Sequence, residues 1–178
     1  MNMRAKEKCL FAIEQLLQIK SIEKISVTEI VTKAGVCRKT FYRNFQDKYD
    51  LVSCYFYQFF DKTFGQIICG EDFDTALVRY LSICEQRSVI LKNAYTSMDI
   101  NNLRNYDIEL TRKTYEKYLL AQGANIETKE MKFAIEIAVR GGTDMVIEWL
   151  MSGMKEDKIS FKNLIKRTLP NDLLQYLK

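Results

Sequence analysis

The stretch AGVCRKTFYRNF, residues 34–45, gathers side chains that bind anions and the edges of bases. These side chains are Arg38, Lys39, Thr40, Tyr42, Arg43 and Asn44. Hydroxyl and cationic groups bind phosphate oxygens, whereas Arg or Lys favours guanine and Asn favours adenine. A short helix can carry such groups into the major groove of DNA. The stretch therefore predicts a contact with nucleic acid.

Charge is unevenly distributed along the chain, which has 178 residues and a formal net charge of +4. Residues 1–48 hold ten Lys/Arg against five Asp/Glu, whereas the remaining residues hold 17 against 18. All the excess positive charge therefore lies near the N-terminus. Such asymmetry indicates that this end of the chain faces a polyanion.

Residue types that many catalytic and metal sites need are missing. The sequence has no histidine, which excludes a histidine-based triad or metal centre. Its five cysteines include no C-x-x-C pair, and we expect reduced thiols in a packed core. There is no phosphate-cradling glycine loop and no cluster of acids beside a nucleophile. We therefore expect a protein without enzymatic activity, metal or cofactor.

The sequence also argues against a membrane protein. No stretch is long and apolar enough to cross a bilayer, and the charged N-terminal residues MNMRAKEKCLF are unlike a signal peptide. We expect a cytoplasmic protein with no membrane partner, which joins the nucleoid when it binds DNA.

The elements around the basic stretch read as a helix-turn-helix. Apolar residues at helical spacing predict a first helix over residues 3–19. Ser26 and Glu29 fit a capping box that starts a second helix, and Gly35 ends it in a left-handed conformation. A short third helix follows over residues 37–44.

The third helix should present its polar side chains outward. Phe41 and Phe45 lie four residues apart and form its inward face. Thr40, Arg43 and Asn44 then point away from the core, with Tyr42 at the edge.

The rest of the chain predicts helices only, since it contains one proline and seven glycines. An aromatic helix is expected over residues 47–68. Further helices are expected over residues 72–86, 88–97, 101–121, 127–152, 160–168 and 170–177. The predicted fold class is all-α.

Residues 26–51, SVTEIVTKAGVCRKTFYRNFQDKYDL, resemble the DNA-binding signature of the TetR/AcrR family of bacterial transcription regulators. The match includes the A-G-V turn, the T-F-Y-x-x-F helix and the D-K-x-x-L start of the next helix. Near the C-terminus, GGTDMVIEWLMSGMKED is similar to the penultimate helix of a branch common in Firmicutes. The resemblance implies a three-helix DNA-binding domain over residues 1–48, with its helix-turn-helix at 26–45. It also implies a helical effector-binding and dimerisation domain over residues 49–178.

The resemblance also assigns expected DNA contacts. They are Thr28, Cys37, Arg38, Lys39, Thr40, Tyr42, Arg43, Asn44 and Lys48. Cys37 stands where the family often has a capping serine, and Asn44 where histidine is frequent. The helix start and adjacent cations should lower the pKa of Cys37, so a redox sensor is the alternative to a plain helix-start residue.

The predicted subunit contact lies on the helix over residues 127–152. Small residues spaced by four let two helices approach closely, and a nearby aromatic can anchor the contact. The predicted interface residues are Ala138, Gly142, Met145 and Trp149, together with the helix at 160–168. The alternative is that this stripe packs only within one subunit.

By resemblance, the central helices hold an effector pocket. Its candidate lining residues are Tyr55, Phe59, Tyr80, Tyr95, Met98, Tyr106, Tyr115 and Trp149, each of which can instead be ordinary core.

The sequence thus predicts a homodimeric, ligand-responsive repressor that binds a palindromic operator in double-stranded DNA and responds to a small-molecule effector. One alternative is an activator, or a regulator controlled by a protein partner. Another, from a different class, is a protein-interaction module with incidental DNA binding.

Overall fold

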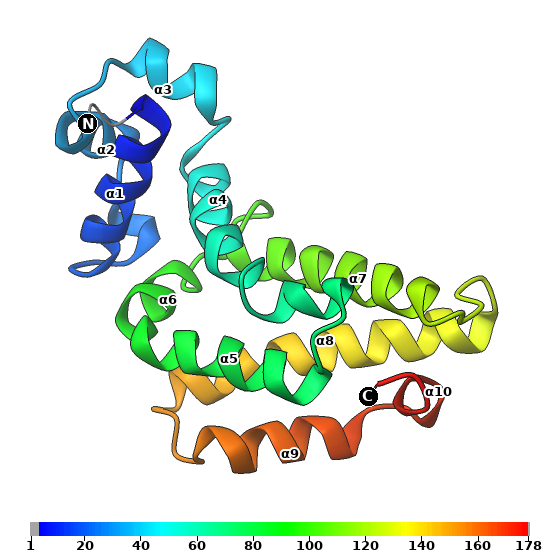
Figure 1. Ribbon diagram of the computed structural model, residues 1–178. Coiled ribbons are helices and arrows are strands. Elements are labelled where there is room, and N and C mark those ends of the chain that lie inside the picture. The colour runs from blue at the N-terminus through cyan, green and yellow to red at the C-terminus, as the bar shows by residue number, and fades with distance from the viewer. Residues whose placement is uncertain (1–3, 178) are drawn as a thin grey trace. The chain divides into compact units, whose positions relative to one another are not determined.

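The computed structural model describes residues 4–177, and these contain helices and no strand (Figure 1). The predicted all-α class is therefore confirmed. The elements are α1 (Ala5–Leu17), η1 (Ile22–Lys24), α2 (Val27–Ala34), α3 (Arg38–Asn44), α4 (Lys48–Phe60), η2 (Phe64–Cys69), α5 (Phe73–Gln86), α6 (Ser88–Ala94), α7 (Leu103–Ala121), α8 (Lys129–Met151), α9 (Lys158–Thr168) and α10 (Asn171–Leu174). The η elements are 3-10 helices. Position 3, the predicted start of the first helix, lies outside the described residues.

The chain packs as two compact units. The first unit runs to Gln58 and also includes Arg87–Tyr106, whereas the second comprises Phe59–Gln86 and the chain from Asp107 onward. Helices α4 and α7 each begin in the first unit and end in the second. The predicted boundary between residues 48 and 49 divides a DNA-binding part from an effector-binding part. It does not coincide with the limits of the two packing units, and it stays a prediction.

Helices α1, α2 and α3 share one apolar core within the first unit. Ile13, Leu17, Ile30 and Phe41 are fully buried. The predicted capping box is present, because the Ser26 hydroxyl accepts from the Glu29 N–H at 3.2 Å and Glu29 accepts from the Ser26 N–H at 2.9 Å. The Lys20 ammonium and then these Ser26 bonds lower the pKa of Glu29 to about 2. These local interactions fix the start of α2 and, through it, the turn that leads to α3.

We expect Ser26→Ala to lower the free energy of unfolding by about 1 kcal/mol, because an N-cap side chain is lost. Urea unfolding followed by circular dichroism measures this change. Ser21→Ala is the matched control, since Ser21 precedes η1 without a side-chain cap bond. An equal effect of the two substitutions would contradict the capping role of Ser26.

The predicted helix over residues 47–68 is wrong in its second half. Helix α4 ends at Phe60, and the Thr63 hydroxyl donates to the carbonyl of Phe59 at 2.7 Å. Such back-bonding offers the chain an alternative to continued helix. The tighter η2 helix then begins at Phe64 and ends at Cys69, and it is followed by Gly70, whose φ of 93° is left-handed. Phe60 and Phe64 lie on either side of this break, and their ring centroids are 5.7 Å apart.

Candidate nucleic-acid interface and interior cavity

Helix α3 is anchored by two aromatic side chains. Phe41 is fully buried and Phe45 is 2% exposed, and their ring centroids lie 5.5 Å apart. The other side of the helix is open to solvent, where Tyr42 is 50% exposed. The exposed neighbours are Arg38, Lys39, Arg43 and Asn44. The predicted orientation of the polar face is therefore present in the fold.

Internal hydrogen bonds hold part of this polar face. Arg38 Nη1 donates to Thr28 Oγ1 at 3.1 Å, and its guanidinium lies 6.0 Å from the Tyr42 ring centroid. Asn44 Nδ2 donates to the carbonyl of Thr40 at 2.7 Å. These bonds bring Thr28 of α2 together with α3 and restrict the side chains before any ligand binds. Such pre-organisation lowers the entropy cost of binding.

Lys39 and Arg43 differ from these neighbours, because the side chain of neither forms an ion pair or a hydrogen bond with any part of residues 4–177. They lie four residues apart on a helix, so they share one side of it. Both cations are therefore available to an anionic partner.

Lys48 has internal partners that the sequence did not indicate. Its ammonium donates to the carbonyls of Ile22 at 2.8 Å and Ile25 at 3.0 Å, next to η1. The side chain thereby ties the start of α4 to the segment before α2. Bonds to carbonyls distant in sequence leave no local pattern, so only the fold reveals them. The expected phosphate contact of Lys48 stays a prediction.

Cys37 occupies the N-cap position of α3 without forming a side-chain cap bond. Its Sγ lies 3.3 Å from Thr40 Oγ1. Hydrogen bonding by the Thr40 hydroxyl, followed by the backbone N–H groups at the helix start, lowers the pKa of Cys37. The direction of this shift is as expected, but its first cause is Thr40 rather than the neighbouring cations.

We expect Cys37→Ser to raise the melting temperature by about 2–4 °C, because a hydroxyl can cap α3 where the thiol does not. Differential scanning calorimetry measures the shift. Cys37→Ala, which supplies no acceptor, is the control and should give no rise. A serine variant that melts no higher than the alanine variant would contradict this interpretation.

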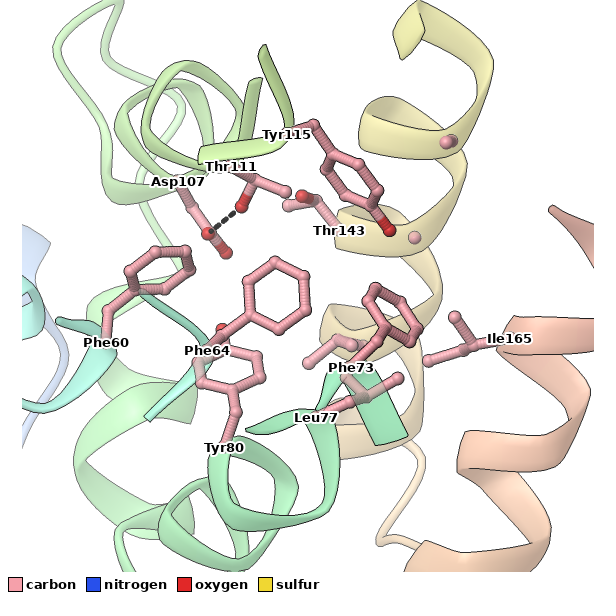
Figure 2. Close-up of a pocket in the computed structure, with 13 residues that line it drawn as sticks. Phe60, Phe64, Phe73, Leu77, Tyr80, Asp107, Thr111, Tyr115, Thr143 and Ile165 are labelled. Carbon is pink, nitrogen blue, oxygen red and sulfur yellow. Dashed lines mark hydrogen bonds between the residues drawn. The ribbon is translucent and has the colours of Figure 1, made fainter. Parts of the chain in front are cut away.

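The second unit contains a cavity of about 40 Å³ (Figure 2). Its lining residues are Phe60, Phe64, Phe73, Leu77, Tyr80, Asp107, Thr111, Tyr115, Ala138, Gly142, Thr143, Val146 and Ile165. In Figure 2 the aromatic residues of α4, η2 and α5 lie along one side, and the polar residues of α7 and α8 along the other. The cavity is therefore apolar on one wall and polar on the facing wall.

Of the predicted pocket residues, Tyr80 and Tyr115 line this cavity. Four others, Tyr55, Tyr95, Met98 and Tyr106, belong to the first unit, and Met98 is 94% exposed. Phe59 is buried in the second unit but does not line the cavity.

The polar wall was missed, although a sequence signal exists. Asp107, Thr111 and Tyr115 are spaced by four and therefore share one face of α7. All three are at most 9% exposed. Asp107 accepts a hydrogen bond from the Thr111 hydroxyl at 3.2 Å. Burial raises the pKa of Tyr115, so its hydroxyl keeps its proton.

Two of the four predicted subunit-contact residues on α8 are internal. Ala138 is 6% and Trp149 2% exposed. The Trp149 indole stacks on Phe161 with centroids 4.9 Å apart, and its Nε1 donates to the carbonyl of Glu156 at 2.9 Å. Trp149 is therefore an anchor between α8 and the chain around α9, with little surface left for a second subunit. Met145 remains 51% exposed.

A neighbouring stripe of α8 is the exposed one. Phe133, Ile137 and Met145 are 70%, 51% and 51% exposed, and Gly141 lies between the last two. Ile137, Gly141 and Met145 also line a groove of about 490 Å³ between α8 and α9, as does the exposed Leu164. This face combines apolar side chains with a hollow that a second helix can enter.

Within the described part of the chain, no group of acidic residues and cysteines could hold a metal ion. Residues 4–177 also include no helix with the length and apolar character needed to span a membrane.

Two family models match this chain, one near its N-terminus and one over its C-terminal part. Residues 10–53 match the family model described as bacterial regulatory proteins, tetR family. Residues 71–171, more than half of the chain, match the model described as a transcriptional regulator C-terminal region. No curated protein matches the sequence.

Solved structures share the fold. The dihydroxyacetone kinase operon activator DhaS aligns with a TM-score of 0.65 and 17% identity, covering 99% of this chain and 97% of that chain. The fatty acid degradation regulator FadR from Bacillus halodurans aligns with a TM-score of 0.59 and 16% identity, covering 95% of this chain and 96% of that chain. FadR from Bacillus subtilis in complex with stearoyl-CoA aligns with a TM-score of 0.55 and 15% identity, covering 97% of each chain. At these identities the likeness concerns the fold alone.

Proposed function

The chain belongs to the TetR family of DNA-binding transcriptional regulators, and from this premise we propose that it is a homodimeric repressor. It binds a palindromic operator through α3 and releases it when a small molecule binds in the second unit. It acts in the cytoplasm, on the nucleoid, and does so without catalysis.

The observation that carries this proposal is the pair of free cations on α3. Lys39 and Arg43 are exposed and have no partner within residues 4–177, whereas Phe41 between them is fully buried. Arg43 reads a base edge, and Lys39 binds a base or a phosphate. The other members of the proposed DNA-binding set are Thr28, Cys37, Arg38, Thr40, Tyr42, Asn44 and Lys48.

One copy of α3 gives too small a contact for a specific site. Specific interfaces with DNA are much larger than a helix of this length supplies, and a dimer binds two half-sites related by two-fold symmetry. We therefore assign the subunit contact to the exposed face of α8, formed by Phe133, Ile137, Gly141 and Met145, together with α9. Gly142 lies beside this face, while Ala138 and Trp149 support it from within the subunit.

Regulation follows from a shift between two populations of the dimer. The cavity walls include residues of α4, α5 and α7, and α4 and α7 each continue into the first unit. A ligand that prefers one packing of these helices favours the state in which the two copies of α3 are wrongly spaced. The free energy available for this shift equals the ligand's differential affinity for the two states.

An activator would bind the same kind of operator, and DhaS, one of the proteins with this fold, is an operon activator. In vitro transcription from the chain's own operator distinguishes the two roles, because a repressor lowers the transcript level and an activator raises it.

The experiment that tests the proposal is selection of bound duplexes from a random pool, followed by the mass of the complex. We expect an enriched palindrome and two chains per duplex. An enriched site without two-fold symmetry, or one chain per duplex, would contradict the proposal.

A further inference from the structure

The outer face of α3, formed by Lys39 and Arg43, points directly away from the buried side of the helix. Each of these residues lies two positions from Phe41, which is fully buried. Since successive residues of a helix are about 100° apart, both cations lie about 160° around the helix from Phe41. When a helix enters the major groove, the side opposite its core contact faces the base edges, and its flanks face the two backbones.

The flanks of α3 carry two polar side chains that are held sideways. Arg38 and Asn44 each lie three positions from Phe41, so they are only about 60° around the helix from the buried side. Arg38 Nη1 donates to Thr28 Oγ1 at 3.1 Å, and Asn44 Nδ2 donates to the carbonyl of Thr40 at 2.7 Å. Their donors are therefore directed at the protein, although Arg and Asn can both read bases in other settings.

No carboxylate of α3 competes for the cations of the outer face, because the helix contains no acidic residue. The acidic side chains of the neighbouring segments have partners of their own. Asp47 accepts from the N–H groups of Tyr49 and Asp50 at 2.8 Å, and Glu29 forms an ion pair with Lys20. The outer face consequently offers hydrogen-bond donors, and it has no carboxylate acceptor for the amino group of cytosine.

Guanine is the base whose major-groove edge matches such donors. It presents two adjacent acceptors, N7 and O6, whereas adenine pairs one acceptor with a donor and thymine has a single acceptor. The two cations are four residues apart, which is about 6 Å along the helix and corresponds to about two base-pair steps of 3.4 Å.

We infer that each half-site of the operator contains two guanines, on either strand and about two base-pair steps apart, one read by Arg43 and the other by Lys39. Arg38 and Asn44 are positioning residues, which fix α3 and its flanks without selecting a base. The inference rests on the proposed operator binding, and it adds the identity and spacing of the bases and the separate roles of the four side chains.

The test uses the operator obtained by selection, with single guanines replaced in both half-sites. The replacement 7-deazaguanine lacks the N7 acceptor, whereas inosine keeps N7 and O6 and lacks only the amino group in the minor groove. We expect 7-deazaguanine at either of the two guanines to lower the affinity about tenfold or more, and inosine to lower it less than about threefold. Fluorescence anisotropy at fixed salt measures the affinity.

Variants of α3 assign each guanine to its side chain. Arg43→Ala should abolish the effect of 7-deazaguanine at one guanine and keep it at the other, and Lys39→Ala should do the reverse. Asn44→Ala is the matched comparison on the same helix. It should lower the affinity for all duplexes by the same factor and leave both effects of 7-deazaguanine unchanged. Circular dichroism and the melting temperature confirm that each variant is folded.

The inference is overturned if the selected half-site lacks the two guanines, if 7-deazaguanine and inosine act alike, or if Arg43→Ala and Asn44→Ala leave the same dependence on N7. A palindrome bound by two chains without dependence on guanine removes only this inference. Guanine-dependent binding of a single chain to a site without two-fold symmetry removes only the proposed function.

Discussion

Replacing Lys39 and Arg43 together by alanine is expected to lower operator affinity about a thousandfold. The double substitution removes four contacts from a dimer, and about 1 kcal/mol for each contact gives this factor. Because neither side chain has a partner within the described chain, the loss reflects DNA contacts rather than unfolding. Fluorescence anisotropy with a labelled operator measures the affinity at fixed salt.

The matched control is Lys113→Ala with Lys117→Ala on α7. Both lysines are exposed, and the pair removes the same amount of positive charge. We expect a change in operator affinity of less than about threefold, since charges far from DNA act only through a screened field. Equal losses in the two double variants would show that net charge, rather than α3, determines binding.

Ile137→Asp is expected to convert the proposed dimer into monomers, raising its dissociation constant about a hundredfold or more. Two-fold symmetry places both new carboxylates in one interface, where each loses its hydration without gaining a partner. Operator affinity should fall as the dimer dissociates, because a monomer presents a single copy of α3 to the DNA. Sedimentation velocity over a range of protein concentrations measures the association.

Met98→Asp provides the comparison for this variant. It also places an acid at an exposed apolar position, since Met98 is 94% exposed, but it lies in the first unit. This chain should stay dimeric. The assigned interface is refuted if the Ile137→Asp protein dimerises as tightly as the Met98→Asp protein.

Local signals in the sequence were enough to predict the DNA-binding helices. The capping box of Ser26 and Glu29 and the left-handed Gly35 act within a few residues, and the structure confirms them. The four-residue spacing of Phe41 and Phe45 likewise fixed which face of α3 is buried. Each of these features depends on neighbours along the chain, so spacing alone predicts them.

Features that depend on distant parts of the chain were not predictable in this way. The apolar stripe chosen on α8 passes through Ala138, whereas the exposed one passes through Ile137. One residue corresponds to about 100° around a helix, and the packing of α8 within the second unit, which includes the stack of Trp149 on Phe161, decides which stripe stays open. The facing walls of the cavity also arise from tertiary packing.

The most direct test of the account is the salt dependence of binding to the selected operator and to a scrambled duplex of equal length. With about six phosphates neutralised by two copies of α3 and its flanks, log affinity should fall by about 5 for each tenfold rise in salt. The operator should also bind about a thousandfold or more tightly than the scrambled duplex at physiological salt. A shallow slope with equal affinity for both duplexes would contradict the central claim that this chain is a sequence-specific regulator acting through α3.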